Sequence, residues 1–186
     1  MRTDVPEKLL AIVEEIDAHG SASLTRLTVL KKWFEHPGRL PAFALWVAKR
    51  AAGRKGRTKA VAGALLNEAR ALLGTTATRE DYLRPVDRGA AKLLHDRARD
   101  FQNEFQHQQW GPVRIVHHWD LMLVEKALEI CLWQSASPAH GYKLAADWCQ
   151  HYDSRYGNGL NGPSRKKVEE IAHFLRKVEA REDAAK

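Results

Sequence analysis

Apolar residues recur at three- and four-residue spacing through most of the chain, the periodicity of helices that bury one face. In the first such segment the apolar positions are Val5, Leu9, Ile12, Val13 and Ile16. Pro6 suits the first turn of this helix, and Gly20 suits the residue after its last turn. The pattern therefore predicts a helix that begins near residue 5 and ends before Gly20.

The same periodicity, read together with cap and turn residues, predicts the remaining helices. Ser21 or Ser23 can cap the second, the turn His36-Pro37-Gly38 stops it, and Thr58, Asp87 and Ser164 can cap later ones. The predicted segments are 24–34, 40–52, 59–73, 87–106, 112–133, 138–152 and 164–181. No stretch alternates as a strand does. The sequence predicts an all-α fold of about seven to eight helices in stacked antiparallel pairs, in a single domain 1–186.

Two of these helices carry distinctive apolar patterns. The segment from Ile115 to Trp133 is apolar nearly all the way round, so it is expected to be the most buried helix. Helix 87–106 has one apolar face, which is predicted to face the core and consists of Ala90, Leu93, Leu94, Ala98, Phe101 and Phe105.

The two halves of the chain share residue types at an offset near one hundred. Leu30, Trp33, Pro37 and Trp46 recur in type and spacing as Ile130, Trp133, Pro138 and Trp148. A degenerate tandem duplication would explain the match, with halves 1–74 and 87–181 joined by a polar connector 75–86. The alternative is chance, since helical hairpins often share turn and core residues.

Composition places the chain among ordinary globular proteins. Its apolar and charged fractions, 44% and 28%, argue against long disorder. Two cysteines, Cys131 and Cys149, lie in apolar helical patterns and are expected to be buried thiols of a reducing compartment. The N-terminus lacks the pattern of a signal peptide, and acidic and basic residues interrupt the apolar stretch from Trp119 to Trp133. A cytoplasmic protein without a membrane partner is expected.

Basic residues exceed acidic ones by 30 to 23, for a formal net charge of +7, and this balance favours anionic partners. The cations gather in two glycine-containing loops that precede predicted helices. Helix N-termini already carry partial positive charge, so added cations are favourable there when an anion such as phosphate binds. The predicted anion or nucleic-acid contacts are Arg54, Lys55, Arg57, Lys59, Arg155, Asn158, Asn161, Ser164, Arg165 and Lys166.

Each basic loop also has a simpler interpretation, as a solvated turn that uses glycine for positive backbone angles. The second loop contains the spacing G-x-G-x-x-G from Gly157 to Gly162, but a helix precedes it where the dinucleotide fingerprint requires a strand, so no cofactor is predicted. Trp46, Tyr152 and Tyr156 lie near the loops and could stack on bases, although Trp46 is expected to pack in the core.

Residue pairs typical of metal sites occur in the chain, but the helix faces that they occupy argue against metal binding. His95-Asp96 matches a pair that metal-dependent phosphohydrolases use, yet both side chains project away from the apolar face of their helix. Glu104 with His107, and Glu170 with His173, have the Glu-x-x-His spacing of di-iron sites. Glu170 and His173 lie opposite the apolar face of their helix, and no metal site is predicted.

Asp120 is the one carboxylate that projects among apolar positions of a predicted buried helix, beside His117 and His118. It can be a helix cap, the partner of a buried arginine, or a general acid or base with a raised pKa. No serine or cysteine lies in a nucleophile motif, so no catalytic residue is assigned.

The sequence thus favours a helical binding module for an anionic partner, with nucleic acid as the first candidate, over an enzyme. One alternative is a protein-interaction domain or homodimer whose charge maintains solubility, which predicts an exposed apolar patch. Another is a small hydrolase or lyase that uses Asp120 and the nearby histidines, which requires a concave polar pocket.

Overall fold

The structure is a computed structural model, and the residues that it describes form helices and turns without strands. The prediction of an all-α fold is confirmed for this part of the chain. The described residues are 2–36, 38–52, 63, 64, 67, 93, 96, 97, 99, 100, 122–130, 136–150 and 162–185.

The first helix, α1 (Val5–His19), begins and ends where the sequence predicts. Pro6 lies in its first turn, where a missing backbone N–H costs nothing. Gly20 adopts the left-handed conformation with φ of 76°, and its N–H donates to the carbonyl of Ile16. This glycine therefore ends the helix as expected.

The second predicted helix is divided. Residues Leu24–Val29 form a 3₁₀ helix, η1, and only Leu30–Phe34 form the α-helix α2. Ser23 caps η1, because its hydroxyl accepts a hydrogen bond from the Thr25 N–H. The Thr28 hydroxyl bonds the Thr25 carbonyl, and β-branched residues of this kind disfavour a regular α-helix. The prediction of one continuous helix from 24 to 34 is wrong here.

Three more helices follow the predicted pattern closely. They are α3 (Arg39–Ala52), α8 (Pro138–Gln150) and α9 (Arg165–Ala184). Residues 122–130 are also helical, and five of these nine positions are buried. At the start of α8, the Ser137 N–H donates to Nδ1 of His140 at 3.0 Å, so a histidine takes the place of the usual acidic residue in a capping box.

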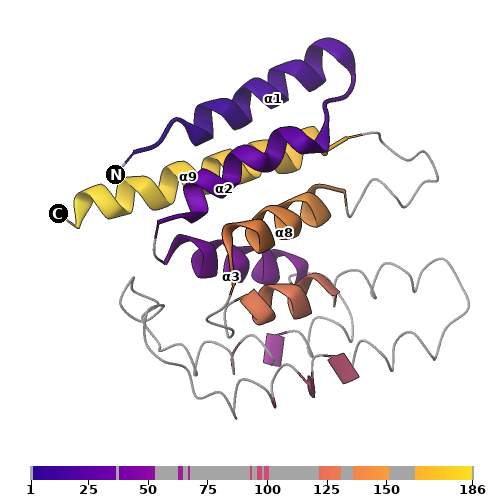
Figure 1. The fold of residues 1–186 in the computed structure, drawn as a ribbon, viewed down its shortest axis with the longest axis vertical. Coiled ribbons are helices and arrows are strands. Elements are labelled where there is room, and N and C mark those ends of the chain that lie inside the picture. The colour runs from indigo at the N-terminus through magenta and orange to yellow at the C-terminus, as the bar shows by residue number, and fades with distance from the viewer. Residues whose placement is uncertain are drawn as a thin grey trace, which may run out of the picture.

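The helices pack around a common core (Figure 1). Helix α1 lies along α9, and α8 contacts both α2 and α3. Gly141 of α8 allows the close approach to α2, because a Cβ at this position would lie 2.6 Å from Phe34 and from Leu40. The two ends of the chain lie at the same end of the molecule (Figure 1).

Some sequence predictions meet a different outcome or lie outside the described residues. Leu93, predicted to face the core, is 68% exposed, so the predicted buried face of helix 87–106 is wrong at this position. Connector 75–86 lies outside the described residues, and the duplication stays a prediction. Cys149 is buried as a thiol, as expected. No helix among the described residues has both the length and the apolar character needed to cross a bilayer.

Candidate anion-binding surface

Three of the ten predicted contact residues lie in the described part of the chain: Ser164, Arg165 and Lys166, at the start of α9. The other seven lie outside it. They are Arg54, Lys55, Arg57 and Lys59 of the first basic loop, and Arg155, Asn158 and Asn161 of the second.

Large side chains join α3 to α9 in an antiparallel register. Arg39, at the start of α3, contacts Glu182 near the end of α9. Trp46 stacks on Phe174 with 4.8 Å between the ring centroids. Arg50, in the last turn of α3, lies 3.1 Å from a carboxylate oxygen of Glu170. The last turn of α3 therefore lies against the beginning of α9.

Four exposed cations lie in the last turn of α3 and the first turn of α9, and we term them the α3–α9 basic surface: Lys49, Arg50, Arg165 and Lys166. Cations are favourable in the last turn of a helix, so Lys49 and Arg50 match the α3 macrodipole without any ligand. Arg165 and Lys166 lie in the first turn of α9, where the macrodipole opposes them. Arg165 and Lys166 are therefore the two cations of this surface whose positions a nearby anion would stabilise.

Arg165 is held by two carboxylates. Its Nε donates to Asp17 of α1 at 2.7 Å, and one terminal nitrogen donates to Glu169 at 2.8 Å. The hydrogen bond to Asp17, followed by the nearby charge of Glu169, raises the pKa of Arg165. All three side chains are about half exposed, at 47%, 51% and 52%, so the contacts remain open to solvent and to competing anions.

Lys167 is not part of this surface, although it directly follows Arg165 and Lys166 in the sequence. It is 7% exposed, and its Nζ donates to the backbone carbonyl of Trp148 at 2.5 Å. The same Nζ lies 4.3 Å from the centroid of the Trp148 ring. Lys167 thus satisfies a carbonyl at the end of α8, and the Ser164 N–H bonds the next carbonyl, that of Cys149.

Ser164 occupies the predicted N-cap position of α9, but its side chain makes no capping hydrogen bond. Its backbone carbonyl accepts from the N–H groups of Lys167 and Val168. The first amides of a helix have no acceptor within the helix, and here the capping side chain does not take one. These amides add to the positive potential at Arg165 and Lys166.

Trp46 is partly buried and packs against the core among other aromatic rings. Phe43 and Phe174 stack on it with interplanar angles of 29° and 26°, and Trp148 meets it edge to face. The Arg50 guanidinium lies 5.0 Å from its ring centroid. Tyr152 and Tyr156 lie outside the described residues.

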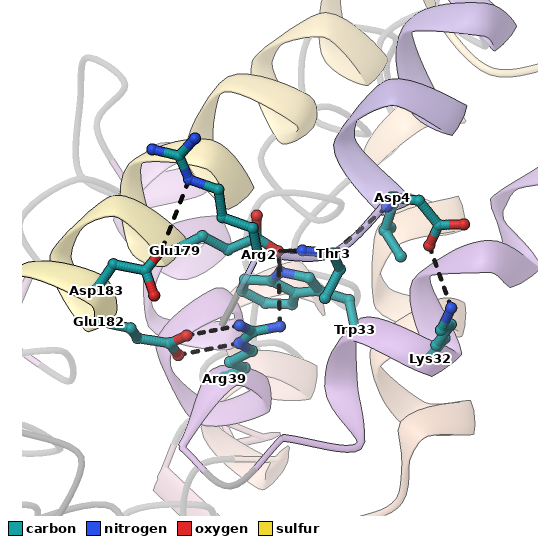
Figure 2. Close-up of polar contacts among 10 residues, drawn as sticks. Arg2, Thr3, Asp4, Lys32, Trp33, Arg39, Glu179, Glu182 and Asp183 are labelled. Atoms are coloured by element: carbon teal, nitrogen blue, oxygen red, sulfur yellow. Dashed lines mark hydrogen bonds and ion pairs between the residues drawn. The ribbon is translucent and has the colours of Figure 1, made fainter. Parts of the chain in front are cut away.

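A second polar cluster joins the two ends of the chain, and sequence analysis did not identify it (Figure 2). Arg39 is 1% exposed and donates to both carboxylate oxygens of Glu182, at 3.0 and 2.6 Å. Its guanidinium also lies 4.9 Å from the ring centroid of Trp33 and 3.7 Å from Glu179. The sequence gives one weak indication of this cluster. Glu179 lies four residues after Leu175, and this spacing places it on the apolar face of α9.

Two of the three charged residues of the cluster, Arg39 and Glu179, are buried, and Glu182 is partly exposed. Glu179 is 4% exposed, and its Oε1 accepts hydrogen bonds from Trp33 Nε1 and from both the N–H and the hydroxyl of Thr3. These contacts join α9 to the N-terminal segment, to α2 and to α3, which indicates a structural role. The cluster positions α9 against α2 and α3, and so fixes the register that brings α9 to the end of α3.

The structure describes the remaining candidate metal and catalytic residues only in part. The described residues contain no group of three potential metal ligands; His173 is exposed, and Glu170 pairs with Arg50. A cavity of about 130 Å³ lies between residues 122–130 and α8, beside the ion pair of Lys126 with Asp147, and is smaller than most ligand pockets. His95, Glu104, His107 and Asp120 lie outside the described residues.

No family model, curated protein or solved structure matches this chain.

Proposed function

We propose that this protein is a helical module that binds nucleic acid through phosphate contacts at the α3–α9 basic surface. The observation that carries the proposal is the ion pair between Arg50 and Glu170, which brings the end of α3 to the beginning of α9. The first basic loop follows α3 directly in the chain, and the second directly precedes α9. Both loops therefore connect to the described fold at one junction.

The mode of binding that this arrangement supports is electrostatic. Arg165 and Lys166 stand at a helix N-terminus, where unsatisfied amides and positive side chains favour phosphate oxygens. Trp46 is partly buried and packs against other aromatic rings. Contacts to the backbone of a nucleic acid carry affinity, and they do not read its sequence.

The alternative, a protein-interaction domain, finds less support in the described residues. Leu93 is the large hydrophobic side chain that is exposed among them, and a single residue does not make an apolar docking patch.

Fluorescence anisotropy with labelled single- and double-stranded DNA and RNA tests the proposal. We expect binding at low salt whose affinity falls with salt concentration, by a slope of about −0.9 per phosphate contact on logarithmic axes for duplex DNA. Substitution of Arg54, Lys55, Arg165 and Lys166 by alanine should reduce affinity by at least about tenfold and make the slope shallower.

The control variant removes the same number of charges elsewhere, on α2 and on the second half of α9. Its substitutions replace the exposed residues Lys31, Lys32, Lys177 and Arg181 by alanine. We expect this variant to retain most of the affinity. Absence of binding by the unmodified protein at low salt, or equal losses in both variants, would contradict the proposal. Circular dichroism of each variant verifies that its helices are intact.

A further inference from the structure

Two charges that are each unfavourable for their own helix meet between α1 and α9. Asp17 lies in the last turn of α1, where the macrodipole disfavours a carboxylate, and Arg165 lies in the first turn of α9, where it disfavours a cation. Their side chains form a hydrogen-bonded ion pair at 2.7 Å. The pairing gives each charge a partner that compensates for its position.

The backbone around this pair is fixed by close packing. Gly162, three residues before Arg165, lies so close to the Ala22 carbonyl that a Cβ would clash with its oxygen. Gly20 turns the chain between Asp17 and Ala22 with a left-handed backbone. Asp17 is therefore presented to the beginning of α9 by the fold, while its side chain stays half exposed.

The Asp17 carboxylate occupies a donor of Arg165 that a phosphate would need. Asp17 binds the Nε, and Glu169 binds a terminal nitrogen. A phosphate that engages the guanidinium with two parallel hydrogen bonds through Nε must displace Asp17. Because an exposed ion pair is weak, a polyanion with several contacts can displace it.

We propose that Asp17 is an intramolecular competitor that reduces the affinity of the α3–α9 basic surface for nucleic acid. This inference rests on the proposed function and concerns the regulation of the same surface. The Asp17 carboxylate occupies the position at Arg165 where a phosphate would bind. A nucleic acid must therefore displace this carboxylate before its own phosphate can bind there. Binding is then selective for polyanions that contact more of the surface than Arg165 alone.

The test compares two substitutions on α1 that remove the same charge. Asp17→Asn releases Arg165, and Glu7→Gln releases Arg176, which pairs with Glu7 at 3.1 Å. Arg176 lies eleven residues along α9 from Arg165, roughly 16 Å away. Glu7→Gln therefore reproduces the change in net charge and the loss of an ion pair, at a distance from the basic surface.

Binding is measured by anisotropy of a fluorescein-labelled single-stranded DNA at low salt. We expect Asp17→Asn to raise affinity about two- to fivefold, the range of one surface ion pair, and Glu7→Gln to have a smaller effect. In an Arg165→Gln background the gain from Asp17→Asn should disappear. Thermal unfolding of each variant verifies that it is folded under the assay conditions.

The outcomes separate the inference from the function on which it rests. Equal effects of Asp17→Asn and Glu7→Gln, or a gain that persists with Arg165→Gln, would overturn the inference and leave nucleic-acid binding intact. No binding by any of these proteins at low salt would overturn the proposed function and the inference together.

Discussion

One carboxylate oxygen of Glu179 accepts hydrogen bonds from two separate segments of the chain. These bonds explain how a carboxylate can be buried in α9. Oε1 accepts from Trp33 at 3.0 Å and from the Thr3 N–H and hydroxyl at 3.2 and 2.6 Å. The Arg39 guanidinium, 3.7 Å away, compensates its charge. A buried charge is tolerated when it is paired and hydrogen-bonded in this way.

Arg39→Met is expected to destabilise the protein by about 3–5 kcal/mol, because it leaves two carboxylates near the core without their cation. Urea unfolding monitored by circular dichroism measures this change. Adding Glu179→Gln and Glu182→Gln to Arg39→Met should recover part of the loss. Lys32→Met, which breaks the exposed ion pair with Asp4, is the control and should change stability little. Similar losses for Arg39→Met and Lys32→Met would refute this account.

Two carboxyl groups with lowered pKa values influence how the stability of the protein changes at acid pH. Hydrogen bonds from Arg39 lower the pKa of Glu182, and hydrogen bonds from Lys8 and Lys32 lower the pKa of Asp4 from 3.8 to about 2. A carboxyl with a depressed pKa binds fewer protons in the folded state than in the unfolded state. The stabilisation that such a carboxyl contributes is therefore complete at pH values above its pKa in the unfolded state. It is lost as the pH falls through its pKa in the folded state.

Glu182→Gln is expected to lower stability by about 1–2 kcal/mol at neutral pH, since it removes the charge from the hydrogen bonds with Arg39. The difference from the unmodified protein should shrink below the ordinary carboxyl pKa of 4.5, as Glu182 itself becomes protonated. Urea unfolding at a series of pH values checks this, with the exposed Glu14→Gln as control. A difference that stays constant from neutral to acid pH would argue against the role of Glu182.

At the scale of elements, the approach of α8 to α2 depends on a side chain that is absent. Gly141 is helical, and Phe34 and Leu40 occupy the space that a Cβ would need. Both of these side chains are themselves buried, so they have little room to move. Glycine usually weakens a helix, and here the close packing of two helices offsets that cost.

Gly141→Ala is therefore expected to destabilise the protein by about 1–3 kcal/mol despite the higher helix propensity of alanine. Gly63 provides the matched control, because it is helical and a Cβ added there would have nothing within 4 Å. Gly63→Ala should stabilise by about 0.5–1 kcal/mol. The two substitutions are compared by thermal unfolding, and a stabilising Gly141→Ala would show that α2 and α8 can separate at little cost.

Local patterns were sufficient to predict most of the described elements. Pro6 and Gly20 bound α1 because their effects are confined to one turn, and periodic apolar residues identified α3, α8 and α9. The division of 24–34 into η1 and α2 was missed, since it depends on side-chain bonds of Ser23 and Thr28 that compete with the helix. The exposure of Leu93 was also missed. Apolar periodicity identifies the apolar face of a helix, but it does not show whether another element packs on that face.

At the scale of the whole molecule, partners distant in sequence decide what each charged residue does. Arg165 and Lys167 look alike in the sequence, yet one pairs with Asp17 on the surface and the other is buried against Trp148. The cluster of Arg39 with Glu179 and Glu182 likewise joins residues more than a hundred positions apart. Such contacts follow from the packing of helices, so a sequence pattern identified the basic loops and could not assign the role of each cation.

The pairing of α1 with α9 determines when the protein can fold during its synthesis. Helix α1 leaves the ribosome before α9, but α9 (residues 165–184) is the helix that covers its apolar face. Until α9 emerges, Trp33 and Arg39 also lack the carboxylates that they bond in the finished core. Contacts of such long sequence separation slow folding, because a large loop must close before they form. The nascent chain therefore exposes the apolar face of α1 until α9 emerges, and during this interval a chaperone has a surface to bind.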